Sequence, residues 1–162
     1  MPIKTTIAVP YFVMQNYLNG DKANRIASLA QHHGKVWIIS ITSPRLSVFD
    51  PEPLVKDDLD RIALEFFDVD TYAPSHFPGQ ETFAVFDAKM ANKIVDFVRV
   101  ANRSNTEDLL VANCHLGVSR SGAVSSFVRS VCGIDFSDWK RLNPQVIPNN
   151  LVLSLLHRAW EA

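Results

Sequence analysis

The chain has 162 residues, 47% of them hydrophobic and 20% charged, which is enough apolar material for the core of one domain and excludes a disordered chain. Sixteen Lys and Arg against seventeen Asp and Glu give a net charge of −1, which excludes a general basic surface for nucleic acid or an anionic membrane. No apolar stretch approaches the roughly 20 residues that cross a bilayer, and two cysteines are too few for a disulfide framework, so we expect a cytoplasmic protein that does not insert into a membrane.

The first half of the chain is predicted to hold one helix and two strands. Asp21 can cap a helix that stops at Gly34. Its apolar residues recur at helical spacing, at Ile26, Leu29 and Ala30. The short apolar run 36–40 is typical of a buried strand, and a second strand is predicted over Ala63–Val69. Between these strands, the prolines and charged residues of 43–58 indicate a surface loop without regular secondary structure.

The second half is predicted to alternate in the same way. A helix over 87–104 would bury one apolar face, made of Ala88, Ala91, Ile94, Val95 and Val98. A third strand over 108–113 runs into Cys114, and a helix over 121–133 ends at Gly133. A short turn is expected over 136–142. The last helix begins near Asn149 and turns Val152, Leu155, Leu156 and Ala159 inward.

This alternation predicts an α/β fold. We expect residues 1–162 to form a single domain, with a central, mostly parallel sheet and helices on both of its faces. Ligands of such sheets bind at the carboxyl ends of the strands, where Cys114, the pair Asp68 and Asp70, and Ser43 are predicted to lie.

The loop between Cys114 and Arg120 carries the chemistry. Gly117 allows the backbone to wrap so that successive N–H groups face one centre, which makes a cradle for a tetrahedral oxyanion. The helix that follows adds its unpaired N–H groups and the positive end of its dipole, and Arg120 adds a planar fork for two phosphate oxygens. A thiol in that field ionises more readily than a free one, so Cys114 is predicted to be a thiolate nucleophile.

A general acid and a hydroxyl group complete the predicted chemistry. A leaving oxygen needs a proton, and Asp68 and Asp70 are the carboxylic acids at the end of the second predicted strand. Ser121 can donate a hydrogen bond to the sulfur and so make it a better leaving group when water attacks the phosphocysteine.

The run from Cys114 to Ser121 resembles the Cys-x-x-Gly-x-Ser-Arg-Ser loop of the cysteine-dependent protein tyrosine phosphatases, most closely the compact dual-specificity branch. The segment 144–149, Pro-Gln-Val-Ile-Pro-Asn, is similar to the Pro-x-apolar-x-Pro-Asn segment of that branch. The resemblance implies a phosphatase that hydrolyses phosphotyrosine in proteins through a phosphocysteine, with phosphoserine and phosphothreonine as further substrates. A phosphorylated protein or peptide would be its partner, and neither a metal nor another cofactor is expected.

The resemblance also implies a role for each loop residue. Cys114 would be the nucleophile, Arg120 the phosphate clamp and Ser121 the hydroxyl that assists breakdown of the intermediate. The phosphate would be bound by the backbone amides of His115, Leu116, Gly117, Val118, Ser119 and Arg120. The alternation Leu64-x-Phe66-x-Asp68 favours Asp68 as the general acid. The separation between Asp68 and Cys114 is longer than is usual in the family, which indicates an insertion over 70–81. Asp70 therefore stays a candidate for the acid.

One departure lies beside the nucleophile. The family usually has histidine there and this chain has Asn113, which can hydrogen-bond the loop but cannot carry positive charge. We therefore predict a less acidic thiol and slower turnover, and two alternatives stay open. One is a phosphoinositide or RNA 5′-phosphate phosphatase on the same scaffold, and the other is a phosphate-binding module with a weakened site. Cys132, within an apolar helix, is expected to be inert.

Overall fold

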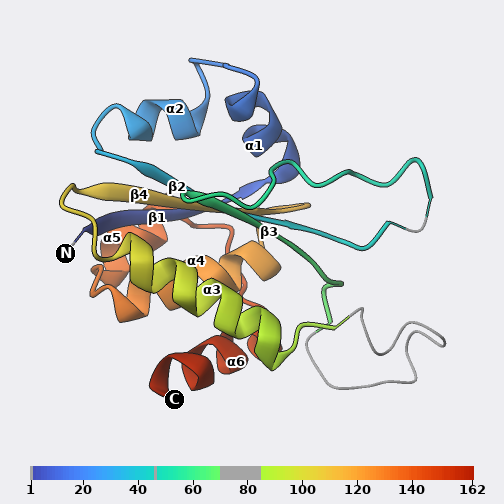
Figure 1. Ribbon diagram of the computed structural model, residues 1–162. Coiled ribbons are helices and arrows are strands. Elements are labelled where there is room, and N and C mark those ends of the chain that lie inside the picture. Colours follow the sequence, from blue (N-terminus) through green and yellow to red (C-terminus); the bar gives the residue numbers. More distant parts are fainter. Residues whose placement is uncertain (1, 46, 70–84) are drawn as a thin grey trace.

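The computed structural model describes residues 2–45, 47–69 and 85–162 (Figure 1). In chain order its elements are β1 (Ile3–Pro10), α1 (Tyr11–Leu18), α2 (Arg25–Ala30), β2 (Val36–Thr42), β3 (Arg61–Glu65), α3 (Ala88–Ala101), β4 (Asp108–Cys114), α4 (Arg120–Val131), α5 (Phe136–Leu142) and α6 (Asn150–Glu161). Strands and helices alternate along much of the chain, as the sequence predicts for an α/β fold.

The sheet has four strands in the order β1-β4-β2-β3, and each neighbouring pair is parallel. The predicted α/β fold with a parallel sheet is therefore confirmed. All residues of β4 are buried, because this strand lies between β1 and β2. Parallel strands end at the same edge, so the end of β4 at Cys114 lies beside the ends of β1 at Pro10 and β2 at Thr42.

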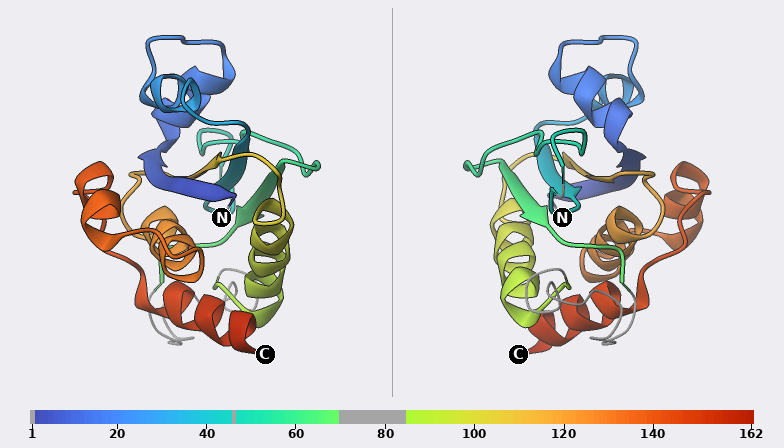
Figure 2. Two further views of the ribbon diagram at one scale, coloured as in Figure 1. Left: turned by 90° about the vertical axis from the view of Figure 1, so that its left-hand side faces the viewer. Right: turned by 90° about the vertical axis from the view of Figure 1, so that its right-hand side faces the viewer.

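Helices cover both faces of the sheet. Figure 2 shows α1 and α2 above it and α3, α4, α5 and α6 below it. Side chains of β4 alternate between the two cores: Leu109 and Val111 pack in the α1/α2 layer, whereas Leu110, Ala112 and Cys114 pack in the layer of α3, α4 and α6. Among the described helices, none is long and apolar enough to cross a membrane.

Two elements at the start of the chain were not predicted from the sequence. β1 pairs along its length with β4, and α1 follows it directly at Tyr11. The helix predicted from Asp21 to Gly34 is shorter than expected, over Arg25–Ala30, and Asn24 caps it by accepting a hydrogen bond from the Ile26 amide at 2.8 Å. Asp21 instead accepts from the Ala23 amide in the preceding turn.

Three smaller differences concern ends and faces. β3 ends at Glu65, four residues before the predicted end at Val69, so Asp68 lies on a loop. Ala88 is exposed at the first turn of α3, although the rest of the predicted apolar face is buried. Residues 136–142 form the helix α5 and not only a turn, because Asp135 caps it by accepting from the Asp138 amide.

Candidate active site

The candidate site is the loop that joins β4 to α4. Cys114 is the last residue of β4 and Arg120 is the first residue of α4, so the loop ends at a helix N-terminus as predicted. Gly117 has a φ of +72°, and a Cβ on it would lie 2.4 Å from the carbonyl carbon of Val9. Only glycine fits this position, because both the backbone angle and the contact with the end of β1 exclude a side chain.

The carbonyl groups of the loop point outward and are hydrogen-bonded by neighbouring segments. His115 O accepts from the Tyr11 amide at 3.1 Å, Gly117 O from Gln145 Nε2 at 3.0 Å, Val118 O from the Ile147 amide at 3.2 Å and Ser119 O from the Asn149 amide at 3.0 Å. In a trans peptide the N–H points opposite to the C=O, so the amides of residues 116, 118, 119 and 120 are turned to the inner side of the loop. Hydrogen bonds from the surrounding protein thus hold the loop in the shape of the predicted anion cradle.

The thiol of Cys114 lies at the base of this cradle and is 3% exposed. Burial alone would raise its pKa, but the Ser121 hydroxyl at 3.1 Å from Sγ, the Ser121 and Gly117 amides and the charge of Arg120 act together against burial. The pKa of Cys114 is therefore lowered from its ordinary value, which is the direction that the predicted thiolate requires.

The guanidinium of Arg120 is 5% exposed and is held by one of its nitrogens. Nη1 donates to the carbonyl of Phe66 at 2.7 Å and to the hydroxyl of Ser43 at 3.0 Å. Nε has no hydrogen-bond partner among the described residues. Because Nη1 is anchored, the edge formed by Nε and Nη2 is the one that can bind two oxygens of an anion.

Asp68 lies over the loop, held by two donors that both reach the same oxygen. The Ser119 hydroxyl and the Asn149 side-chain amide each donate to Asp68 Oδ1 at 2.8 Å. Since Oδ1 accepts both bonds, Oδ2 is the oxygen that can carry a proton to a leaving group. Asp68 also lines, with the loop, a pocket of about 250 Å³.

Asn149 connects the acid to the loop and to α6. Its side chain donates to Asp68 and to the carbonyl of Val69 at 3.1 Å, and its Oδ1 accepts from the Val152 amide, which caps α6. With its own amide bonded to Ser119 O, this buried residue fixes the distance between the acid and the cradle.

The structure brings most of the predicted site residues together. The pocket is lined by Asp68, Cys114, His115, Leu116, Val118, Ser119 and Arg120, while Gly117 packs against β1 and Ser121 lies against the sulfur. The side chain of His115 is exposed. The alternative acid Asp70 and the predicted insertion 70–81 lie outside the described residues, so only Asp68 can be placed.

The side chain of Asn113 does not hydrogen-bond the loop, although an asparagine beside the nucleophile can in principle do so. Strand alternation turns Asn113 toward the α1/α2 layer, on the opposite face of the sheet from Cys114. It is 0% exposed, and neither Oδ1 nor Nδ2 has a partner among the residues that the structure describes. The expected effect of Asn113 on the acidity of the thiol stays a prediction.

Several supporting residues were not identified from the sequence. Gln145 and Asn149 lie in the segment 144–149, whose likeness to the phosphatase segment was the available signal. Ser43, by contrast, was predicted at the carboxyl end of its strand, and there it binds Arg120. Tyr11 contacts the loop only because β1 ends beside β4, which no local pattern indicates. Within residues 2–45, 47–69 and 85–162, no cluster of three or more His, Cys, Asp and Glu is placed to hold a metal ion.

No known protein family matches the sequence, and no curated protein matches it. A function must therefore be inferred from the residues of the site and their contacts.

Proposed function

We propose that this chain is a cysteine-dependent phosphatase that hydrolyses phosphotyrosine in proteins, with phosphoserine and phosphothreonine as further substrates, through a phosphocysteine on Cys114. The observation that carries the proposal is the combination of a buried thiol with a lowered pKa and a loop whose outward carbonyls are bonded by the rest of the fold. A nucleophile beneath a preformed oxyanion cradle is the arrangement that substitution at phosphorus requires.

Substrate binding uses the cradle and Arg120. The phosphate oxygens accept from the inward amides of the loop and from the Nε and Nη2 edge of the guanidinium. The anchoring of Nη1 on Phe66 and Ser43 holds this edge in place before the substrate arrives, so little side-chain freedom is lost on binding.

In the first chemical step the Cys114 thiolate attacks phosphorus in line with the leaving group. The S–P bond forms while the P–O bond to the substrate breaks, and the electron pair of that bond goes to the leaving oxygen. Asp68 transfers the proton on Oδ2 to this oxygen, so the phenol or alcohol leaves as a neutral molecule. The hydrogen bonds from Ser119 and Asn149 keep Oδ1 turned away from that transfer.

In the second step water attacks the phosphocysteine. The Asp68 carboxylate accepts a proton from the water, the new P–O bond forms, and the S–P bond breaks with its electron pair on sulfur. Ser121 Oγ, 3.1 Å from Sγ, donates a hydrogen bond to the thiolate that departs. Phosphate is released and the starting protonation of Asp68 is restored.

The substrate class follows from the charges of the loop. Phosphoinositides and RNA 5′-ends carry further negative charges, and an enzyme acting on them needs basic residues inside or around the cradle. Residues 115–119 contain no lysine or arginine, which favours a phosphoprotein. Both cysteines are free, which fits the cytoplasm as the compartment.

The test is hydrolysis of aryl phosphates in the presence of a chelator, combined with acid quenching of a phosphotyrosine peptide reaction. We expect turnover in chelator and a phosphorylated peptide containing Cys114. Asp68→Asn should lower kcat by about 10²-fold or more, with the largest loss for phenyl phosphate and the smallest for p-nitrophenyl phosphate, whose leaving group needs protonation least.

Phosphopeptide binding without any turnover would contradict the proposed reaction and favour the phosphate-binding module. Turnover that needs an added metal ion would contradict the thiolate mechanism.

A further inference from the structure

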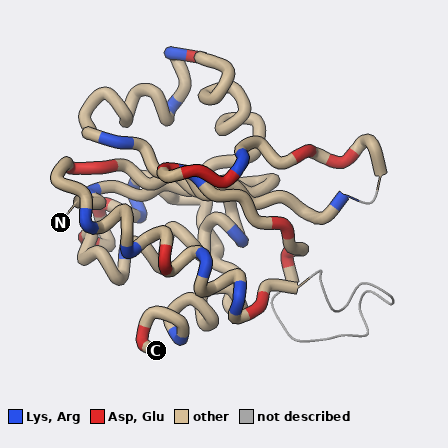
Figure 3. The backbone as a smooth tube through the Cα atoms, in the orientation of Figure 1, with Lys and Arg blue, Asp and Glu red and all other residues tan. Residues whose placement is uncertain are grey.

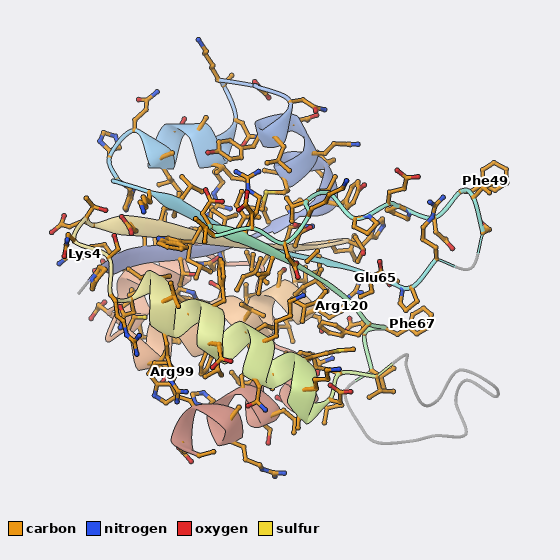
Figure 4. All side chains as sticks on the ribbon, in the orientation of Figure 1. Lys4, Phe49, Glu65, Phe67, Arg99 and Arg120 are labelled. Atoms are coloured by element: carbon orange, nitrogen blue, oxygen red, sulfur yellow. The ribbon has the colours of Figure 1, made fainter. Side chains whose placement is uncertain are left out.

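Three large apolar side chains are exposed around the loop that joins β4 to α4. Phe12 is 61%, Leu116 is 68% and Ile147 is 73% exposed. Single exposed apolar residues are common, but several grouped beside one site mark a contact surface. Phe49 is more exposed than these three, but it lies well apart from Arg120 in Figure 4 and does not belong to the group. The proposed reaction gives the three side chains no role, and we call them the apolar rim.

The segments that carry Phe12 and Leu116 lie side by side, because the end of β1 packs against the loop. The Tyr11 amide, directly before Phe12, donates to the carbonyl of His115, directly before Leu116, at 3.1 Å. The close contact of Gly117 with the end of β1 joins the same two segments. Phe12 and Leu116 therefore project from neighbouring backbone at one border of the loop.

Ile147 borders the same loop from the segment before α6. Its amide donates to the carbonyl of Val118 at 3.2 Å, two residues beyond Leu116. Gln145 lies two residues earlier and bridges the loop and β1 through hydrogen bonds of 3.0 Å. Leu116 and Val118 both line the pocket of the candidate active site. The apolar rim is therefore continuous with the wall of that pocket.

The segments that carry the apolar rim contain no charged residue. Asp, Glu, Lys and Arg make up 20% of the chain, but none of them occurs within 5–20, 109–119 or 142–157. In Figure 3 the helix α1 has no charged residue along its length, whereas charged residues mark the loop 43–58. A substrate segment that lies over the apolar rim meets no charge there, so burial of apolar surface is what can bind it.

The charged loop 43–58 approaches the cradle from another direction. This loop follows β2, whereas Phe12 follows β1, and these two strands flank β4 on opposite sides. The Tyr11 hydroxyl donates to the carbonyl of Glu52 at 2.8 Å, so Tyr11 is the residue of α1 that faces the charged loop. Phe12 is the next residue of the helix and is turned about 100° from Tyr11. Apolar and charged surfaces therefore border the cradle separately.

We propose that the apolar rim binds an apolar side chain of the substrate, from a residue within three positions of the phosphotyrosine. With the phosphate in the cradle, the peptide leaves the pocket past Leu116, which belongs both to the pocket and to the apolar rim. An extended peptide advances about 3.3 Å per residue, so side chains close to the phosphotyrosine reach Phe12 and Ile147. The proposal rests on the proposed function, since it names the phosphoproteins that the same site selects.

A peptide fits the apolar rim better than a membrane surface does. Proteins that bind anionic lipids place Lys or Arg beside the apolar side chains that enter the membrane. The segments 5–20, 109–119 and 142–157 offer neither residue. The occupant is therefore expected to be a neutral, apolar part of a protein substrate.

The experiment measures binding, because binding does not depend on turnover. Phosphotyrosine peptides that carry Leu or Ala at one position from −3 to +3, with Ser and Gly elsewhere, are titrated against the Cys114→Ser protein by fluorescence anisotropy. At one or more positions we expect the Leu peptide to bind about fivefold more tightly than the Ala peptide. This ratio should not fall as salt is raised, since screening weakens charge pairs and not apolar contacts.

Phe12→Gln with Ile147→Thr, added to Cys114→Ser, tests the assignment to the apolar rim. Both substitutions keep the backbone amides, and we expect the Leu-to-Ala ratio to fall below about two. The affinity for inorganic phosphate, measured by competition with the Ala peptide, should stay the same, because the loop is unchanged. The matched control is Phe136→Gln with Val100→Thr, which should keep the ratio.

The control residues match the apolar rim in exposure and lie far from the cradle. Phe136 is 58% and Val100 is 54% exposed. Phe136 begins α5, after the C-terminal end of α4, whereas the cradle lies at the N-terminal end of α4. Val100 lies in the last turn of α3, before β4 begins, whereas the cradle follows the end of β4.

The outcomes separate the two proposals. Equal binding of the Leu and Ala peptides at every position, or a Leu preference that survives substitution of the apolar rim, would overturn the inference. Binding of phosphatidylcholine and phosphatidylserine vesicles, or dimer formation, that the same substitutions abolish would also overturn it, because the occupant would then be a membrane or a second copy of the chain. A Leu preference that only the rim variant loses would support it even if the wild type hydrolysed none of the peptides, a result that would contradict only the proposed catalysis.

Discussion

Cys114, at the end of β4, and Cys132, at the C-cap of α4, differ in the hydrogen-bond donors that face their sulfur atoms. Cys114 is 3% exposed and Cys132 is 2% exposed, so burial is nearly equal. Burial raises the pKa of Cys132 to about 11, whereas hydrogen bonds from Ser121 and Gly117 and the charge of Arg120 overcome burial and lower the pKa of Cys114. Reactivity at these sites is thus set by the donors that face the sulfur and not by access to water.

The largest expected difference between the two cysteines is in the effect that replacing each has on kcat. Cys114→Ser should lower the kcat for p-nitrophenyl phosphate by about 10⁴-fold or more, because an alcohol beneath the cradle does not ionise near neutral pH. The matched change Cys132→Ser should keep kcat within a few-fold of the wild type, since Cys132 lies at the C-terminal end of α4 and the cradle lies at the N-terminal end. Equal losses in both variants would mean that Cys114 acts only through stability.

Removing one hydrogen-bond donor to the Cys114 sulfur should make the acidity of this thiol more like that of Cys132. In Ser121→Ala the hydroxyl at 3.1 Å from Sγ is lost, so the thiolate is less stabilised and the pKa of Cys114 should rise. The measurement is the pH dependence of iodoacetamide alkylation at each cysteine by mass spectrometry. An unchanged midpoint at Cys114 would mean that backbone amides alone hold the thiolate.

Removing one of the hydrogen bonds to the outward carbonyls of the loop should have a smaller effect, on the affinity of the cradle for an anion. Gln145 Nε2 donates to Gly117 O and to Ala8 O, both at 3.0 Å, and Gln145→Met keeps the size of the side chain without the donor. We expect the affinity for vanadate to fall about tenfold, as one well-placed hydrogen bond is worth about 1 kcal/mol or slightly more. Gln15→Met, on the exposed side of α1, is the control and should bind vanadate like the wild type.

The smallest expected effect concerns stability at alkaline pH. Below about pH 8.5 Cys132 is protonated in both the folded and the unfolded chain, so its thiol does not change stability with pH there. Between that pH and about 11 only the unfolded chain loses the proton, so the unfolding free energy should fall by about 1.4 kcal/mol per pH unit as the pH rises. The thiol of Cys114, with its lowered pKa, acts in the opposite direction.

Urea unfolding under reducing conditions at pH 7.5 and pH 10 measures this effect. The wild type should lose about 1–2 kcal/mol more than Cys132→Ala between the two pH values. Titration of other groups is common to both proteins and cancels in the comparison. If the two proteins lost the same free energy, the Cys132 thiol would titrate alike in the folded and unfolded states.

Local patterns predicted the part of the fold that surrounds the nucleophile. The apolar run into Cys114, the glycine within the loop and the apolar helix after it are signals contained within 108–133, so strand, loop and helix were found at nearly the right bounds. β1 was missed because its apolar residues are interrupted by Thr5 and Thr6, and its pairing partner β4 lies about a hundred residues later in the chain.

The supporting contacts of the candidate site could not be read from the sequence for a similar reason. The bonds of Asn149 to Asp68 and of Gln145 to Gly117 join segments that meet only when the chain before α6 returns to the loop and α6 packs against α3 and α4. Asp68 itself was identified by the alternation before it, although β3 ends at Glu65 and the acid is held by a loop. A pattern can therefore name the reactive groups, whereas their orientation depends on the tertiary fold.

A cradle whose shape is held by hydrogen bonds from the surrounding protein should also fit the product of the proposed reaction. Inorganic phosphate is tetrahedral like the phosphate group of the ester, and on the proposed function it would accept from the same amides of residues 116, 118, 119 and 120. We therefore expect product and substrate to compete, so that turnover slows as phosphate accumulates and the protein melts at a higher temperature in phosphate buffer. At a phosphate concentration one hundred times its dissociation constant, the folded state would gain about 2.7 kcal/mol. The cell's own phosphate level would set how much of this protein is free to act.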